Sequence, residues 1–297
     1  MTSQQLLDAL LRDHDDNPAE AALQLPALVL ADDLPPEALP RLAWLINHLV
    51  GESLGDWSQA WRLQQGLRQD APHAATLRHG MVAATLAGDS MSAWQLREQW
   101  LAQGIAPHEL DVLLELSIVL ALHRQEPPAR QIQALARLLP DLQALEAGGQ
   151  DAALAGCCNN IVSALLDKPE LEIGDAFCKQ VLSAMAHAAR QLWGRAGGWL
   201  QHERAEYLLA LTANRFEDWE AGLAAARAGL ALIAANGEED VDRAFLLVEA
   251  ARALRGLERE GEADETLRQA MALAESFDAS LRAWFDGCAR RAEPVAA

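Results

Sequence analysis

The chain has 297 residues, of which 51% are hydrophobic, and its 43 acidic and 24 basic side chains give a net charge of −19. So acidic a protein repels phosphate groups and anionic lipids, which excludes binding of nucleic acid or of a membrane surface through a basic patch. Its hydrophobic residues are mainly alanine and leucine, the strongest helix formers, and Tyr207 is its single tyrosine. The composition therefore predicts an all-α protein.

Targeting signals and disulfide spacing are not expected. The first twelve residues lack the basic start and apolar run of a secretory signal, and no apolar run approaches the roughly 18 residues of a membrane span. The cysteines follow no paired spacing; they are Cys157, Cys158, Cys178 and Cys288. We expect a cytoplasmic protein whose reduced thiols act as small buried hydrophobes.

Near the amino terminus, three oxygen-bearing residues have the spacing that begins a calcium loop: Asp13, Asp15 and Asn17. Such a loop next requires a glycine and later a bidentate glutamate, and those places hold Pro18 and Gln24. We interpret the segment instead as a helix end, followed by a helix that Asn17 caps and Pro18 begins.

An internal repeat is visible further along. The segment that starts Gly55-Asp56 recurs 33 residues later as Gly88-Asp89, and two helices with two short turns need about this length. Each glycine is expected to end one helix in the left-handed conformation, which costs glycine no steric penalty. Each aspartate is then expected to cap the next helix.

Tryptophans occupy matching positions in the two copies. Trp61 and Trp94 are repeat equivalents on an apolar stripe, so we expect both to fill the core between helices. Trp57 differs, because its counterpart is Ser90 and the repeat does not require an aromatic ring there. We therefore predict that Trp57 contacts a partner.

The pattern resembles the tetratricopeptide repeat family. The resemblance is carried by the Gly-Asp turns, by a small residue after each of them and by Pro72 and Pro107 near the unit ends. It implies antiparallel helix pairs, with first helices at 42–49 and 77–87, stacked into a right-handed superhelix (an α-solenoid). It also implies a concave groove that binds a protein or a peptide.

The same pattern returns less regularly in the second half. In 216–223, Glu217 stands where the turn glycine is expected, and in 250–267 the turn is placed at Gly261. The resulting spacing of 44 residues is longer than the usual unit and resembles repeat domains of some bacterial regulators.

Between these copies the repeat is less clear. We predict a helix from Pro128 to Leu139 that Pro140 ends, then helices at 152–166 and 175–193. The linker-like segment around Gly148 suggests two helical repeat regions, 1–147 and 148–297, or a single superhelix that bends there.

No set of residues indicates catalysis. His202-Glu203-Arg204-Ala205-Glu206 begins like a zinc-protease helix, but Glu206 replaces the second histidine, so we interpret it as a solvated helix face. The glycine-rich segment 194–198 lacks the lysine of a phosphate-binding loop and is expected to be a simple loop. We expect no enzyme activity, cofactor or metal.

Two functional hypotheses follow. The first is a non-catalytic adaptor for a basic or amphipathic protein or peptide, contacted by Trp44 and Trp57. Some tetratricopeptide domains hold a partner's carboxylate with lysines, but this chain has lysine only at 168 and 179. Arg41 and Arg78 are the candidates that remain.

The alternative is a regulatory sensor that binds a small molecule or peptide signal between its two halves. This hypothesis is suggested by the long repeat spacing and by the Trp- and Leu-rich segment 193–211.

Overall fold

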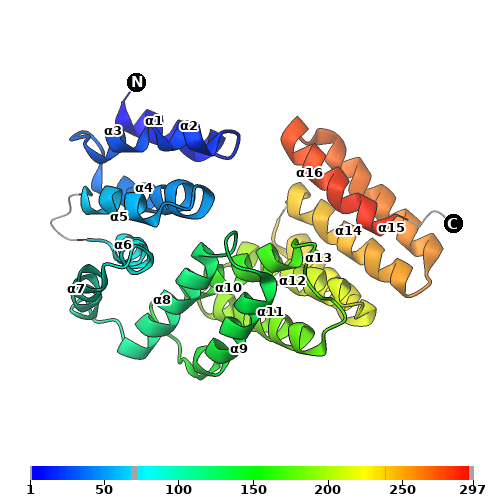
Figure 1. Ribbon diagram of the computed structural model, residues 1–297. Coiled ribbons are helices and arrows are strands. Elements are labelled where there is room, and N and C mark those ends of the chain that lie inside the picture. Colours follow the sequence, from blue (N-terminus) through cyan, green and yellow to red (C-terminus); the bar gives the residue numbers. More distant parts are fainter. Residues whose placement is uncertain (1, 68–71, 238, 294–297) are drawn as a thin grey trace. The chain divides into compact units, whose positions relative to one another are not determined.

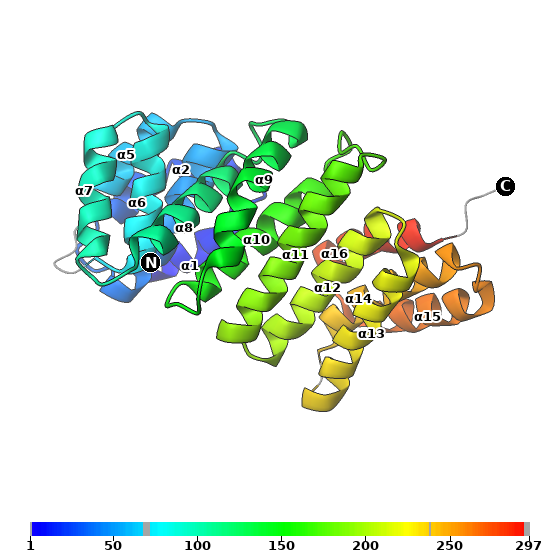
Figure 2. The same cartoon turned by 90° about the horizontal axis from the view of Figure 1, so that it is seen from below.

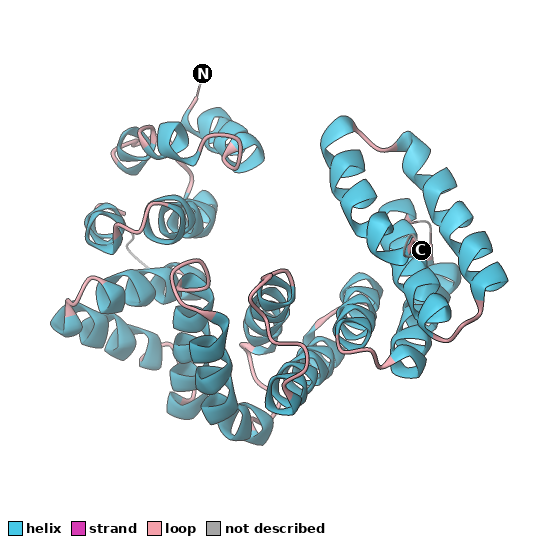
Figure 3. Ribbon diagram, turned by 45° about the vertical axis from the view of Figure 1, so that its right-hand side comes forward, coloured by secondary structure: helices cyan, strands magenta, loops and turns pink. Residues whose placement is uncertain are grey.

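The computed structural model describes residues 2–67, 72–237 and 239–293, and every regular element within these ranges is a helix (Figure 3). The prediction of an all-α protein is confirmed. The four cysteines are free and buried, which confirms their expected place in the interior. Across the described ranges, no helix combines the length and the apolarity needed to cross a bilayer.

The chain divides into two compact units, Met1–Gln131 and Ile132–Ala297, and the division falls inside helix α9 (Pro128–Ala144). It therefore precedes the linker-like segment around Gly148. The prediction that Pro140 ends this helix is wrong, because Pro140 lies inside α9. Leu138 and Leu142 are buried on either side of it, so packing holds the helix together across the missing hydrogen bond.

The first unit is built from short helices, and in Figure 1 its three amino-terminal helices (blue) lie next to α4 and α5. As predicted, Asn17 caps α2 and Pro18 is its first residue. The elements of this unit are α1 (Ser3–Asp13), α2 (Pro18–Ala22), α3 (Leu25–Val29), η1 (Pro36–Ala38), α4 (Leu39–Ile46), η2 (Asn47–Ser53), α5 (Trp57–Gln65), α6 (Ala74–Leu86), α7 (Ser90–Leu101) and α8 (Pro107–Ala121).

The turn geometry predicted from the repeat is confirmed. Gly55 and Gly88 have φ of 74° and 81°, and the carboxylates of Asp56 and Asp89 accept from the backbone of the helices that follow. The amide of Asp89 also donates to the carbonyl five residues earlier, at 2.9 Å, which satisfies the helix end. At the first turn the corresponding bond runs from the Asp56 amide to the carbonyl of Val50, six residues earlier. Val50 lies in the π-helical segment η2, which precedes this turn.

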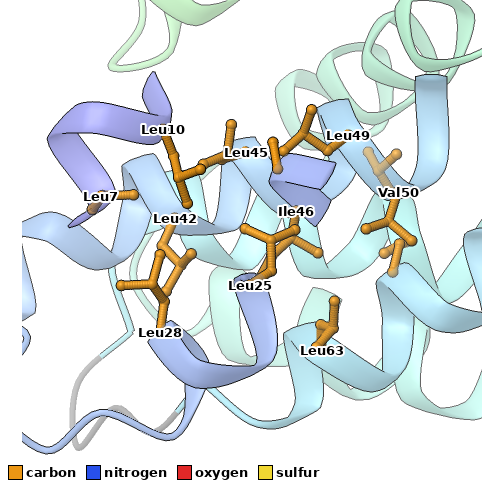
Figure 4. Close-up of a cluster of buried hydrophobic side chains, with 14 of the residues drawn as sticks. Leu7, Leu10, Leu25, Leu28, Leu42, Leu45, Ile46, Leu49, Val50 and Leu63 are labelled. Carbon is orange, nitrogen blue, oxygen red and sulfur yellow. The ribbon is translucent and has the colours of Figure 1, made fainter. Parts of the chain in front are cut away.

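Leucine side chains from all parts of the first unit meet in one core. Figure 4 shows Leu7 and Leu10 from α1 facing Leu42 and Leu45 from α4. Leu25 and Leu28 enter from α3 and Leu63 from α5, and all of these side chains are buried. Each contributes about 2 kcal/mol by leaving water, so the short amino-terminal helices are held by packing rather than by their own length.

The prediction that both repeat tryptophans fill the core holds only in part. Trp61 packs against the core of the first unit, and its indole N–H donates to the Asp89 carboxylate at 3.0 Å. Trp94 is 56% exposed, so the prediction is wrong for this residue. The position that corresponds to Asp89 one repeat later is Leu122, whose side chain offers the Trp94 indole no acceptor.

The second unit has longer helices, and in Figure 2 α10 to α13 lie side by side in chain order. Two aromatic and aliphatic clusters fill its interior, one of them around Phe245 and Phe285. Its elements, after α9, are α10 (Asp151–Leu166), α11 (Ala176–Ala196), α12 (Trp199–Arg215), α13 (Trp219–Asn236), α14 (Asp240–Gly256), α15 (Glu260–Leu273), η3 (Ala274–Ser276), α16 (Ala279–Ala289) and η4 (Arg290–Ala292).

Turns of the same kind recur here without glycine. Glu217 has φ of 58°, so it takes the left-handed place that the sequence indicates for it. The predicted turn at Gly261 is wrong, because Gly261 lies inside α15 and the left-handed residue is Glu258, with φ of 60°. The spacing from Glu217 is thus 41 residues rather than 44. The loop expected at 194–198 is also shorter, since α11 continues to Ala196.

Gly256, at the end of α14, tests how closely α13 and α14 are packed. A Cβ atom there would lie 2.2 Å from the Trp219 ring, so Gly256→Ala should lower the free energy of unfolding by about 1–3 kcal/mol. Gly261→Ala is the matched control, because it faces open space inside a helix and should raise stability by about 0.5–1 kcal/mol. Urea denaturation measures both; equal effects would contradict the close packing.

Candidate functional site

The second unit carries a groove whose floor is α12 and whose walls are α11 and α13. Two cavities lie along it, of about 620 Å³ and about 180 Å³. The larger is lined by Arg190, Gln191, Gly194, His202, Glu206, Ala228, Ala231 and Leu232. The smaller is lined by Lys179, Ser183, His187, Leu209, Thr212, Ala213, Asp218, Ala221 and Ala225.

The groove exists because the wall from α13 is made of small residues. Ala221, Ala225 and Ala228 repeat at helical spacing and turn the same side of α13 toward the cavities. Gly229 lets α13 pack closely against α14, since a Cβ atom at this position would lie 2.8 Å from Leu246. Larger side chains at the alanine positions would fill the space over α12.

Ion pairs bridge the groove near each cavity. The Arg190 guanidinium on α11 meets the Glu206 carboxylate on α12 at 2.5 Å, beside the larger cavity. Next to the smaller one, Lys179 lies 3.5 Å from Asp218, which stands at the start of α13. The α11 wall therefore carries the positive member of each ion pair, while the alanine and leucine side chains of the groove supply apolar surface.

The segment that resembles a zinc-protease helix is not a solvated face, so that interpretation is wrong. Glu203 is fully buried and Glu206 is 6% exposed, because α13 and α14 cover this side of α12. Neither carboxylate oxygen of Glu203 has a hydrogen-bond partner. Burial, together with the neighbouring Asp242 carboxylate, raises the pKa of Glu203 to about 9, and Arg204 opposes the shift only in part. At neutral pH Glu203 therefore holds a proton.

This raised pKa makes stability depend on pH. The folded pKa of Glu203, about 9, lies above its ordinary value of 4.5, so the folded chain binds the proton more tightly than the unfolded chain. The associated stability is complete below pH 4.5 and is lost as pH rises toward 9, at no more than about 1.4 kcal/mol per pH unit.

Glu203→Gln removes this dependence, because the amide cannot ionise. The variant should gain stability relative to the wild type at pH 8 and gain little or none at pH 5, as measured by urea denaturation at both values. Glu220→Gln, at an exposed position of α13, serves as the control and should change the stability at neither pH. A gain of equal size at both pH values would contradict the assignment.

The four residues predicted to bind a partner lie apart from this groove, in the first unit. Trp57 is only 7% exposed; its ring covers Gly51 and its indole N–H donates to Gln125, so its place is in the core. Trp44 is 37% exposed and stacks on His48, with ring centroids 4.9 Å apart.

The two candidate arginines occupy different helices. Arg41 lies on α4 and pairs with Asp8 at 3.0 Å. Arg78 is half-buried on α6 beside His79. Burial lowers the pKa of His79 to about 3, and the Arg78 charge adds to this shift. Each arginine thus has its own surroundings.

Sequence reasoning did not find the groove. The available signal is the alanine spacing on α13, which by itself indicates only a helix. The burial of Glu203 and Glu206 had no local signal, since which face of α12 is covered depends on how α13 and α14 pack. No protein-family model and no curated protein sequence matches this chain.

Proposed function

We propose that this chain is a non-catalytic cytoplasmic adaptor of the tetratricopeptide type, in which helix pairs stack into a right-handed superhelix. The recurrence of one turn supports this: a left-handed residue stands just before the second helix of a pair at Gly55, Gly88, Glu217 and Glu258. The 33-residue repeat of the first two turns points the same way.

The groove along α12 is the proposed binding site, and the larger cavity is the observation that carries the proposal. Its apolar alanine and leucine surface, crossed by charged pairs, suits an amphipathic peptide that lays one apolar face into it. The net charge of −19 favours a peptide with basic residues on its other face. Trp44, Arg41 and Arg78 remain predicted contacts in the first unit, whereas the buried Trp57 is not part of the proposed surface.

Blocking the groove tests this function. Ala231 is an exposed residue of α13 at the larger cavity, so Ala231→Trp should fill the groove without disturbing the core. We expect a fluorescein-labelled amphipathic peptide of leucine and lysine, followed by fluorescence anisotropy, to bind the wild type and to bind this variant at least about tenfold more weakly.

Two controls separate groove binding from general attraction between opposite charges. Ala272→Trp, at an exposed position of α15, should leave the affinity unchanged. A peptide of leucine and glutamate should bind weakly to every variant. If Ala231→Trp and the wild type bind the leucine–lysine peptide equally well, the groove is not the site.

A second candidate function is a sensor of a small molecule, and the size of the larger cavity favours it. About 620 Å³ falls within the range of small-molecule sites, and His202, Arg190 and Glu206 offer polar contacts at its rim. In a thermal-shift screen of metabolites, a true ligand would raise the melting temperature of the wild type and of Ala272→Trp, but not of Ala231→Trp.

A further inference from the structure

Two histidines and an aspartate meet where α1 ends. His14 is the residue that follows α1, Asp15 comes next, and His48 lies 34 positions after His14, in η2. One ligand atom from each side chain lies within 4.8 Å of the others. A π-helical segment such as η2 is rare and often occurs at functional sites, and here it carries His48.

Hydrogen bonds set the protonation of both imidazole rings. His14 Nδ1 lies 3.1 Å from the carbonyl oxygens of Leu10 and Leu11. Because carbonyls only accept, Nδ1 carries the proton and Nε2 of the neutral ring keeps its lone pair. His48 Nδ1 lies 2.9 Å from the Glu52 carboxylate, which orients this ring in the same way. A histidine held by a carbonyl or carboxylate through one nitrogen is the usual arrangement of a metal ligand.

The free Nε2 atoms face a shared carboxylate. His48 Nε2 is 3.6 Å from one oxygen of Asp15, and His14 Nε2 is 3.7 Å from the other. Both distances are too long for hydrogen bonds. Each distance is close to the separation of two ligands on one tetrahedral zinc ion, which is about 3.4 Å when each bond is about 2.1 Å.

The surroundings hold the rings in place and leave one side open. Trp44 stacks on His48 and meets His14 edge-on, with centroids 5.6 Å apart. His14 is 9% exposed, so it is held in the interior of the first unit. The Asp15 side chain, by contrast, is 75% exposed. An ion can therefore enter from solvent on the side of Asp15 and meet two histidines that are already oriented.

The donor atoms select the kind of metal. Two imidazole nitrogens and one carboxylate favour zinc or a neighbouring transition metal over calcium or magnesium, which require mainly oxygen ligands. Three protein ligands leave the fourth position of a tetrahedral zinc ion to water or to a group from another molecule. The strongly acidic chain also raises the local concentration of divalent cations.

We propose that His14, Asp15 and His48 bind a single Zn²⁺ ion through the two Nε2 atoms and the Asp15 carboxylate. Glu52 is a positioning residue that holds the ring of His48. The bound ion joins the end of α1 to η2, so zinc stabilises the amino-terminal helices of the first unit. From the sequence alone no metal is expected, and this site is independent of the groove in the second unit.

The test uses the untagged full chain after treatment with a chelator. Isothermal titration with ZnCl₂ should give one ion per chain, and Co²⁺ should develop the visible d–d absorption of a tetrahedral site. Asp15→Asn should weaken zinc binding at least about tenfold without a folding cost, since Asp15 is exposed. His48→Ala should remove the cobalt absorption, and Glu52→Gln should weaken binding by about 10–100-fold.

Weak attachment of zinc to surface acids must be distinguished from this site. His108→Ala makes the same change at an exposed histidine of α8 and should bind zinc like the wild type. An excess of Mg²⁺ should not displace the zinc. The proposal is overturned if the wild type binds no zinc, or if Asp15→Asn and His48→Ala both retain the wild-type affinity.

Discussion

The turns before α5, α7, α13 and α15 depend on one backbone constraint, which is that a single residue at each of them takes the left-handed conformation. At Gly55 and Gly88 this is free of strain, but Glu217 and Glu258 adopt it at a cost of about 1–2 kcal/mol each. The following amide then donates back into the helix, as in the 2.9 Å bond from Asp218 to Ala213, so the helix end is satisfied and the chain reverses. Packing of the next helix offsets the strain at the two glutamates.

Small residues then decide how close the reversed helices come. In the second unit, Gly256 accepts the ring of Trp219 and Gly229 admits Leu246, so α13 and α14 approach tightly. On its other side α13 presents alanines to α12, and the same small side chains that permit close packing leave the groove open. Core and candidate site thus arise from one sequence property, the abundance of alanine and glycine at helical spacing.

The distribution of acids follows from this packing rather than from composition. Most of the 43 acids give the chain its negative charge, but Glu203 and Glu249 are enclosed between helices, where burial raises their pKa values. Asn214 donates to Glu249 at 2.7 Å, whereas neither oxygen of Glu203 accepts a hydrogen bond and the Arg204 guanidinium lies 3.5 Å from one of them. The two buried acids, Glu203 on α12 and Glu249 on α14, are therefore stabilised in different ways.

The sequence alone determined the helical class, the first two turns and their caps, because these depend on residues within a few positions of one another. It also determined that Glu217 would replace a turn glycine. It misplaced the next turn at Gly261 and ended α9 at Pro140, since burial of leucines on both sides outweighed the local signal of proline. Only the tertiary structure decided that Trp57 is buried and Trp94 exposed, that α12 forms the floor of a groove, and that His14 meets His48. These outcomes depend on contacts between residues distant in the chain, and no local pattern of side chains encodes them.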